Sequence, residues 1–504
     1  MMARDIKELA QSVRVSHLLI LLLSLAFLGT SIAAPQVWAK FLGKTDVYTI
    51  TVYEPKGERV TVVDGGRDHS LAISSTGQLY GWGYNSNGML GTGNTTLVNV
   101  PTKNSIVEVG GSREVKFADI SPGHNMTFGL DRNGDVWAWG LGTYGRLGLG
   151  NTTNYTTPQK VTFTGNPKIE KITSSIDIGI ALDENGKIWV WGNNASSGVF
   201  GNGTTTGTRT TPALVTNFGS EDPVFVDVEA PRVETNRTIL ALDSDGSIWG
   251  WGENLYGIMS TGNQTRQSTP MKIYNSATGQ WANPTTAPNG ILPYHLPAGT
   301  KMEKISLSYS VGLAIDEHGN MYSWGSNYER GLGTASTSTT GYNWRPDQIY
   351  NASTGRWKAA NGPHNAEGIK MTSVKVMRSS CFAIDEAGSV YSWGNGNYGV
   401  LGSGSSSNVI IPMRLYNAET GLFNGGQSLP AGTKMDQVTG NFYHAFFLAK
   451  NGDIFTTGEG EHRKLGNGIL GNRSTPVKIS EGIAGSAFPL SFSDFHPDAP
   501  PLNK

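Results

Sequence analysis

Two glycine triplets in this 504-residue chain have the spacing of a nucleotide-binding loop. Gly140-Gly142-Gly145 and Gly394-Gly396-Gly399 match G-x-G-x-x-G, in which backbone amides and a helix start hold a pyrophosphate. That chemistry requires the triplet to open a helix directly after a strand. Both triplets instead begin at the glycine of a repeated Trp-Gly pair and open no helix. We therefore predict no dinucleotide cofactor.

Two acidic turns have the oxygen-bearing side chains that calcium prefers. They are Asp131-Arg132-Asn133-Gly134 and Asp243-Ser244-Asp245-Gly246. In a calcium loop the glycine stands at the sixth position and a bidentate Glu at the twelfth. Here the glycine is fourth, and no Glu stands at the twelfth position. We therefore predict hairpin turns and no metal site.

The histidines and the one cysteine are the remaining reactive side chains. His69 and His444 occupy equivalent places before two similar strands, which favours a structural role, and no H-E-x-x-H pair occurs. Cys381 by itself excludes an internal disulfide and predicts a free thiol in the core. No nucleophile–base pair or carboxylate pair stands out. We therefore predict no catalytic residue and no cofactor, and that the protein is not an enzyme.

The composition excludes two further classes of protein. The 39 Lys and Arg residues nearly balance 40 Asp and Glu residues, whereas a nucleic-acid binder needs a basic surface. Aromatic residues make up 10% of the chain, which is too much apolar surface for a disordered protein. The 66 glycines suit a large core joined by regular turns.

Seven repeats account for most of these motifs. Each repeat has an apolar segment, a tight glycine turn and a second segment that ends in a Trp-Gly pair, a pattern that predicts a β-hairpin. Another aromatic residue precedes each marker tryptophan by two positions and shares its strand face, which predicts packing between neighbouring sheets. The marker tryptophans are Trp82, Trp139, Trp191, Trp251, Trp324 and Trp393, and Thr457 marks a degraded seventh repeat.

A proline after each marker predicts the start of a further strand, because proline is tolerated at the first strand position. These prolines are Pro101, Pro158, Pro212, Pro270, Pro346, Pro412 and Pro476. Each repeat then supplies about four short strands. Seven such units that close a ring avoid exposed sheet edges. The predicted fold is all-β, a seven-bladed β-propeller of four-stranded antiparallel blades, preceded by an N-terminal signal segment.

The repeat pattern resembles the regulator of chromosome condensation repeat family over roughly residues 60 to 480. The resembling features are the apolar segment, D-x-x-G, the aromatic residue, Trp-Gly, L-G-x-G and the proline strand. The resemblance implies a seven-bladed β-propeller whose ring surface binds other proteins. It also implies that strands from both chain ends share one blade, with Val47–Tyr53 and the stretch after Pro476 as candidates. Thr457 departs from the pattern, so the last blade lacks its packing tryptophan.

The first 39 residues differ from the repeats. Basic residues precede an apolar run at 18–28, as in a signal peptide, and Val37 and Ala39 predict cleavage before Lys40. An uncleaved membrane anchor is the alternative. The predicted segments are a leader at 1–39, a propeller at 40–488 with inserts at about 274–299, 350–368 and 416–432, and a tail at 489–504.

The three inserts follow the proline strands of consecutive repeats. Equivalent loops of a propeller emerge on one face, so the inserts predict a raised patch there. Aromatic residues on rigid loops are typical of protein-binding hot spots. The alternative is that each insert is a β-hairpin whose aromatic residue folds back onto its own blade. The predicted partner-binding residues are Trp281, Tyr294, Trp344, Trp357 and Phe423.

Together these features favour a secreted or cell-surface protein-binding propeller. We expect it to be monomeric, to bind no nucleic acid, and to be attached to a membrane only if the leader is retained. A structural or adhesive module of the cell surface is the alternative. A guanine-nucleotide exchange factor, as known in the family, fits less well because the chain has a leader and no basic tail.

Overall fold

The computed structural model describes residues 36–40, 49–53, 59–104, 114–232, 237–282, 295–336, 338, 342–358, 362–363 and 365–479. The chain divides into two units, Met1–Glu58 and Arg59–Lys504. In the first unit, β1 (Gln36–Lys40) pairs antiparallel with β2 (Thr49–Tyr53). The predicted apolar leader lies outside the described residues, and the predicted cleavage before Lys40 falls at the end of β1. No helix among the described residues has the length and apolar character needed to cross a membrane.

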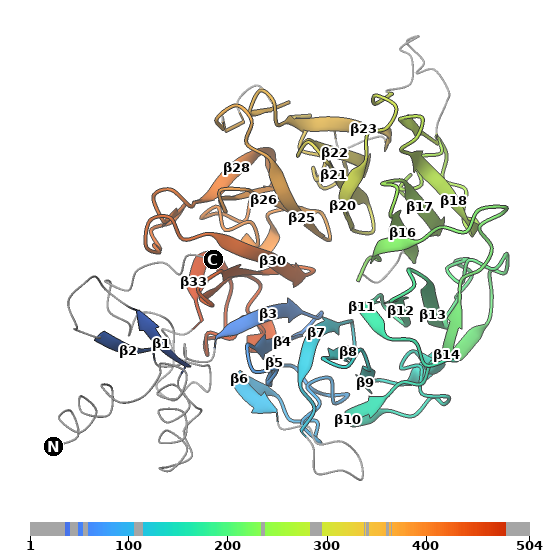
Figure 1. Ribbon diagram of the computed structural model, residues 1–504, viewed down its shortest axis with the longest axis horizontal. Coiled ribbons are helices and arrows are strands. Elements are labelled where there is room, and N and C mark those ends of the chain that lie inside the picture. The colour runs from blue at the N-terminus through green and yellow to red at the C-terminus, as the bar shows by residue number, and fades with distance from the viewer. Residues whose placement is uncertain are drawn as a thin grey trace, which may run out of the picture. The chain divides into compact units, whose positions relative to one another are not determined.

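The second unit is a ring of seven antiparallel sheets, which confirms the all-β propeller (Figure 1). In each blade we call the strands A to D from the ring axis outward. Four blades have four strands each. Blade 1 has β3 (Val60–Gly65), β4 (His69–Ser74), β5 (Leu79–Gly83) and β6 (Val98–Asn104); blade 2 has β7 (Phe117–Pro122), β8 (Met126–Asp131), β9 (Val136–Gly140) and β10 (Tyr155–Lys160); blade 3 has β11 (Ile169–Ser174), β12 (Ile178–Asp183), β13 (Ile188–Asn193) and β14 (Thr208–Leu214); blade 7 has β30 (Met435–Asn441), β31 (His444–Ala449), β32 (Ile454–Gly458) and β33 (Arg473–Lys478).

Three blades have a short fifth strand, which the sequence did not predict as part of the sheet. In each, strand D is longer and turns back into a two-residue strand. Blade 4 has β15 (Phe225–Glu229), β16 (Thr238–Asp243), β17 (Ile248–Gly252), β18 (Gln267–Asn275) and β19 (Gln280–Trp281); blade 5 has β20 (Met302–Leu307), β21 (Val311–Asp316), β22 (Met321–Ser326), β23 (Tyr342–Asn351) and β24 (Arg356–Trp357); blade 6 has β25 (Met371–Met377), β26 (Ser380–Asp385), β27 (Val390–Gly394), β28 (Val409–Asn417) and β29 (Leu422–Phe423).

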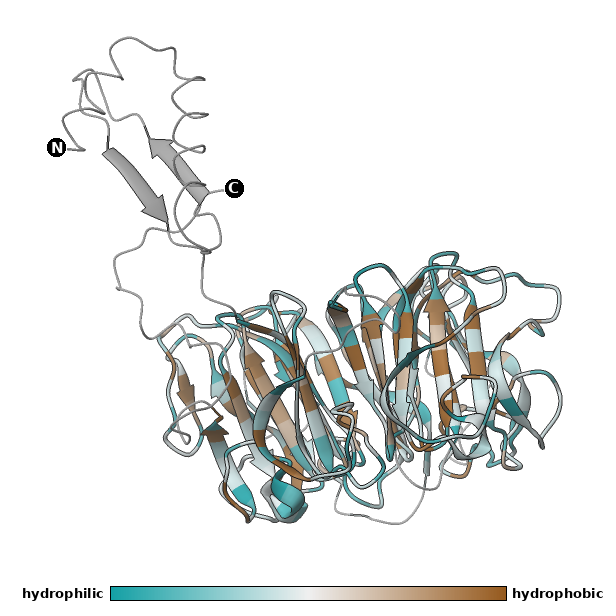
Figure 2. Ribbon diagram, turned by 90° about the horizontal axis from the view of Figure 1, so that it is seen from below, coloured by the Kyte–Doolittle hydropathy of each residue, from teal (hydrophilic) through white to brown (hydrophobic). Residues whose placement is uncertain are grey.

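Alternating chain direction assigns the loops to two faces of the ring. The A–B and C–D loops emerge together on one face, which we call the AB/CD face. The B–C turns and the linkers between blades emerge on the other, the BC/DA face. Figure 2 shows hydrophobic residues concentrated in the strands and hydrophilic residues in the loops, so the cores lie between the sheets.

The marker tryptophans join each blade to the one before it. All six are fully buried, as the repeat pattern predicts. Each indole N–H donates a hydrogen bond to a backbone carbonyl in the C–D loop of the preceding blade; Trp191 Nε1, for example, lies 2.9 Å from Arg146 O. Thr457 has no ring, but its hydroxyl donates the equivalent bond to Val400 O at 2.6 Å. The acceptors for the other tryptophans are Lys464 O, Met89 O, Val199 O, Ile258 O and Gly331 O.

The same bonds close the ring, and the expected blade shared by both chain ends is wrong. Every blade consists of consecutive strands, and Thr49–Tyr53 pairs with β1 rather than with a blade. Blade 1 meets blade 7 through Trp82 Nε1 and Ser70 Oγ, which both donate to Lys464 O, at 2.8 and 2.9 Å. Ring closure among the described residues therefore depends on side-chain contacts rather than on a shared sheet.

The aspartates of the hairpin turns hold the blades together internally. Asp183 Oδ1 accepts the backbone N–H groups of Asn185 and Lys187, and Asp183 Oδ2 accepts Trp189 Nε1 at 2.8 Å. Asp131 and Asp243 make the same bonds. These contacts confirm the predicted hairpin turns, because the carboxylates are engaged by the turn itself.

The prolines lie inside the D strands, which corrects their predicted place at a strand start. Pro158 is the fourth residue of β10, and Pro212 is the fifth of β14. In both strands the pairing register shifts next to the proline. Proline donates no backbone hydrogen bond and is therefore accommodated at such irregularities and on outer strands.

Candidate protein-binding surface

The aromatic residues of the inserts lie inside the molecule, so the predicted raised patch is wrong. Trp281, Trp357 and Phe423 are only 7%, 5% and 4% exposed. Each lies in a short fifth strand and contacts an aromatic ring of the next blade, with centroid distances of 5.3 Å for Trp281–Trp324 and 5.6 Å for Trp357–Trp393. The inserts are hairpins whose aromatic residues fill the seams between blades.

The other two predicted residues do not restore the patch. Trp344 is half-buried near the AB/CD end of β23, where its ring lies 4.8 Å from that of Tyr342 and its carbonyl accepts Ser260 Oγ. Tyr294 lies outside the described residues. The five predicted residues therefore do not form one surface.

In two of the shorter linkers between blades, a phenylalanine also packs against tryptophan of the next blade. Phe163 lies 5.4 Å from the Trp189 ring and 5.8 Å from the Trp191 ring, and Phe218 lies 5.6 Å from the Trp249 ring. Phe163 and Phe218 follow proline strands that have no insert. This recurrence at uninterrupted linkers is the sequence signal that identifies the insert aromatics as part of the core.

A different group of aromatic residues gathers on the AB/CD face of blades 4 to 7. The Tyr256 and Tyr309 rings meet edge-on at 5.1 Å, and the Tyr398 and Tyr443 rings lie 4.7 Å apart. Between them, the Arg378 guanidinium lies 4.9 Å from the Tyr443 ring and 5.9 Å from that of Tyr309. These five residues, with Tyr328 and Glu329, are called the tyrosine–arginine surface below.

Buried charge orients the centre of this surface. Glu329 accepts Arg378 Nη2 at 3.0 Å and Tyr309 OH at 3.0 Å. Desolvation opposes ionisation of Glu329, but hydrogen bonds and charge attraction from Arg378 outweigh it and lower the pKa of Glu329. Desolvation and the nearby Glu329 raise the pKa of Tyr309 to about 12, so its hydroxyl stays protonated. The Arg378 guanidinium and the Tyr309 hydroxyl are thus held in place by Glu329.

The edges of this surface face solvent. Tyr328 is 68% exposed and Tyr398 41% exposed. Tyr398 lies in a single 3-10 turn, Asn397–Gly399, with a positive φ of 59°, and Tyr144 has the same place in blade 2 with a φ of 62°. Sequence reasoning missed these residues. The available signal was a tyrosine at the fifth position after a marker tryptophan and directly before a glycine, as at Tyr144, Tyr256 and Tyr398.

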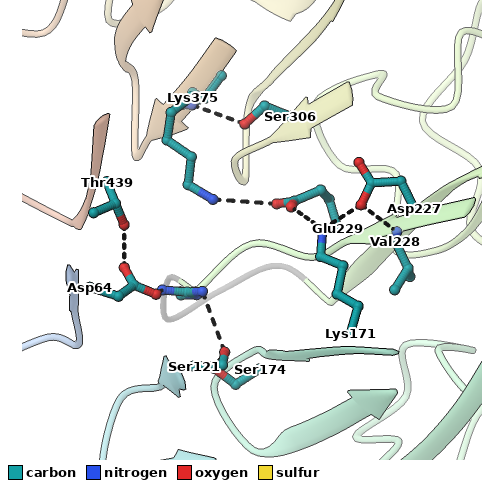
Figure 3. A network of polar contacts seen from close by, with 12 residues as sticks. Asp64, Ser121, Lys171, Ser174, Asp227, Val228, Glu229, Ser306, Lys375 and Thr439 are labelled. Carbon is teal, nitrogen blue, oxygen red and sulfur yellow. Dashed lines mark hydrogen bonds and ion pairs between the residues drawn. The ribbon is translucent and has the colours of Figure 1, made fainter. Parts of the chain in front are cut away.

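Charged and polar side chains of several blades form a network of contacts near the ring axis (Figure 3). Lys171 binds Asp227 and Glu229, and Lys375 also reaches Glu229 at 3.5 Å. Desolvation opposes ionisation of Glu229, but the two ammonium groups outweigh it and lower the pKa of Glu229 to about 2. These ion pairs link blades 3, 4 and 6 around the axis.

A second axial group joins blades on opposite sides of the ring. Arg232, from the A–B loop of blade 4, pairs with Asp64 of blade 1, and Thr439 of blade 7 donates to the same carboxylate. The Arg232 guanidinium also lies 3.3 Å from Ser121 Oγ. The axis is therefore cross-linked by polar contacts that brace the blades carrying the tyrosine–arginine surface.

Acid should destabilise the seam between blades 1 and 2 through His69. Its ring is fully buried, and desolvation lowers the pKa of His69 to about 3. The unfolded chain binds more protons below pH 6.5, so stability falls as the pH drops from 6.5 towards 3. Between pH 7 and 5 this one ring costs about 2 kcal/mol.

Urea unfolding at the two pH values measures this effect. The variant His69→Gln lacks the titrating ring, so its loss of unfolding free energy between pH 7 and 5 should be about 2 kcal/mol smaller than that of the wild type. All other titrating groups are present in both proteins, so the difference between the two losses measures the contribution of His69. Equal losses in both would contradict a neutral, buried His69.

Comparisons with known proteins agree with this architecture. The model of the regulator of chromosome condensation (RCC1) repeat matches residues 76–130, 133–182 and 387–423, and a second RCC1 repeat model matches residues 60–88. The ultraviolet-B receptor UVR8 of Arabidopsis thaliana is 27% identical over 295 residues, which are 57% of this chain and 59% of the receptor. The chain thus spans less than two thirds of the length of this relative.

Two solved structures have a similar fold. Human WBSCR16 superposes with a TM-score of 0.61 at 17% identity, over 81% of this chain and 96% of that one. Prp20p from Saccharomyces cerevisiae, described with its binding to Gsp1p and histones, superposes with a TM-score of 0.58 at 18% identity, over 84% and 88% of the two chains. The chain is a seven-bladed β-propeller that carries RCC1 repeats.

Proposed function

We propose that this propeller is a non-enzymatic protein-binding module and that its partner docks on the tyrosine–arginine surface. The observation that carries this proposal is the placement of Tyr256, Tyr309, Arg378, Tyr398 and Tyr443 in mutual contact on one face. Tyrosine and arginine are the residue types enriched in binding hot spots. Because Glu329 and the neighbouring rings already hold Arg378, docking loses little side-chain entropy.

The rest of the chain supports a partner that is a protein outside the cytoplasm. The basic and apolar leader favours export, and the formal net charge of −1 disfavours nucleic acid. Prp20p, which shares the fold, is described as binding Gsp1p and histones, which are protein partners. We propose that the protein acts as a secreted or cell-surface monomer.

Alanine at Tyr398 should weaken partner capture by about 2 kcal/mol, or roughly 30-fold in affinity. The partner is first isolated by pull-down from the exported fraction, and its affinity for each variant is then measured. Tyr144→Ala is the matched control, because Tyr144 has the same turn, the same backbone conformation and similar exposure, on blade 2.

Two results would contradict this assignment. Equal affinity losses for the Tyr398 and Tyr144 variants would mean that the surface around blades 4 to 7 has no special role. Retention of the protein in the cell envelope without a captured soluble partner would favour a structural or adhesive module instead.

A further inference from the structure

Blade 3 has an open cavity away from the tyrosine–arginine surface. Its volume is about 530 Å³, within the size range of small-molecule sites. The walls come from the B–C turn, the end of strand D and the linker from blade 2, all at the BC/DA face. They include Trp189, Pro212, Leu214, Pro167 and Lys187.

At the cavity, blade 3 lacks a long polar side chain that the other blades have. In every blade one residue of strand D pairs with the first aromatic residue of strand C and therefore shares its sheet face. In six blades this strand-D residue is long and polar, and we call it the lid; in blade 3 it is Leu214, opposite Trp189. The six lid pairs are Lys103 with Tyr80, Lys160 with Trp137, Lys272 with Trp249, Gln348 with Tyr322, Arg414 with Tyr391 and Lys478 with Phe455.

In blades 4 and 6 the lid lies close to the aromatic ring with which it pairs. Lys272 Nζ lies 4.9 Å from the centroid of the Trp249 ring, and the Arg414 guanidinium lies 5.6 Å from that of Tyr391. Their aliphatic stems lie along apolar surface while the charged heads reach outward. Leu214 is shorter and has no polar head group, and the cavity lies beside it, whereas the Trp189 ring is itself buried against Phe163.

The residue just before strand C has a positive charge in blade 3 and a negative charge in two other blades. In blades 2 and 7 the lid lysine meets an aspartate at the start of strand C, with Lys160 2.6 Å from Asp135 and Lys478 3.1 Å from Asp453. The equivalent position in blade 3 is Lys187, four residues after the turn aspartate, as Asp135 is. The cavity lining therefore has the Lys187 ammonium beside the carboxylate of Asp183, whose oxygens already accept the backbone N–H groups of Asn185 and Lys187 and the indole N–H of Trp189.

Lys187 can accept a new partner at small cost. Its ammonium pairs with Asp222, whose side chain is 88% exposed. Ion pairs with a solvent-exposed partner contribute little to stability. A ligand carboxylate in the cavity would replace this pair while the ligand's apolar body covers Pro212 and Leu214, of which Leu214 is 40% exposed.

We propose that the blade 3 cavity binds a carboxylate carried on a small aliphatic body. The carboxylate accepts hydrogen bonds from Lys187 Nζ, and the aliphatic part takes the place of the missing lid stem. This chemistry is shared by a free branched-chain fatty acid and by the C-terminal carboxylate of a leucine in a peptide. The proposal is independent of the partner on the AB/CD face.

Calorimetric titration of the full chain with 4-methylpentanoate and with 4-methylpentanamide tests the charge. The acid should bind about tenfold more tightly than the amide, because a hydrogen bond to a charged group contributes about 1.5 kcal/mol. N-acetyl-Ala-Ala-Leu, with a free or an amidated C-terminus, tests the source. Binding of the free peptide assigns the site to chain termini, and binding of 4-methylpentanoate alone assigns it to free acids.

Three variants locate the site. Leu214→Lys restores the lid that other blades have, so it should abolish binding without lowering Tm. Lys187→Gln should remove the preference for acid over amide. Lys272→Leu opens the equivalent place in blade 4, where Ser247 replaces the cation, and should add no acid binding.

Three outcomes would overturn the proposal. The first is that neither the acids nor the peptides bind the wild type. The second is that acid and amide bind with equal affinity. The third is that binding survives Leu214→Lys, which would place the ligand elsewhere.

Discussion

Replacing Trp191 with alanine should lower the free energy of unfolding by about 3–5 kcal/mol. The Trp191 ring is fully buried between blades 2 and 3, where it meets Phe128 edge-on at 5.4 Å and Phe163 at 5.8 Å. Its indole N–H also donates to Arg146 O at 2.9 Å. The truncation leaves a cavity at this seam and removes the hydrogen bond between the blades.

Thr457→Ala is the matched control, because Thr457 occupies the same place in blade 7. Its hydroxyl keeps the hydrogen bond to Val400 O but fills no aromatic volume. The expected loss is therefore about 1–2 kcal/mol, the cost of an unpaired buried group. Urea unfolding of both variants, monitored by circular dichroism, gives the comparison. Similar losses would refute the view that aromatic volume at the seams stabilises the ring.

Replacing Trp357 with alanine should also cost about 3–5 kcal/mol and lower Tm. Trp357 belongs to an insert, yet it is buried against Tyr350, Tyr391 and Trp393, with centroid distances of 5.1, 5.5 and 5.6 Å. These rings belong to blades 5 and 6. Loss of Trp357 therefore opens the seam between two blades rather than altering an exposed patch.

Trp357→Phe should be tolerated, with a change below about 1.5 kcal/mol. Phe423 occupies the equivalent place in the next insert, and Trp357 Nε1 has no hydrogen-bond partner among the described residues. Thermal unfolding of the alanine and phenylalanine variants tests the aromatic requirement. An unchanged Tm for Trp357→Ala, accompanied by weaker partner capture, would return this residue to a binding role.

The architecture was readable from the sequence because its signals are local and repeated. In five hairpins an aspartate, a glycine three residues later and a Trp-Gly pair define the hairpin within about fifteen residues, and weaker versions of the same signal mark the first and seventh. The signal recurs seven times, complete or degraded, and the structure has seven blades at those places. Burial of the six marker tryptophans followed from the same repetition. The hydroxyl of Thr457 shows the limit, because its bond to Val400 joins residues 57 positions apart.

The surfaces were decided by tertiary structure. An aromatic residue on an insert looks the same in sequence whether its ring faces solvent or the next blade, and Trp357 faces the next blade. The tyrosine–arginine surface draws residues from four blades, so a local pattern can mark single members such as Tyr398 but not the contacts between them. The sequence by itself therefore specified the strands and the ring. Which side chains meet across blades depended on how the ring closes, since those contacts join residues that are far apart in the chain.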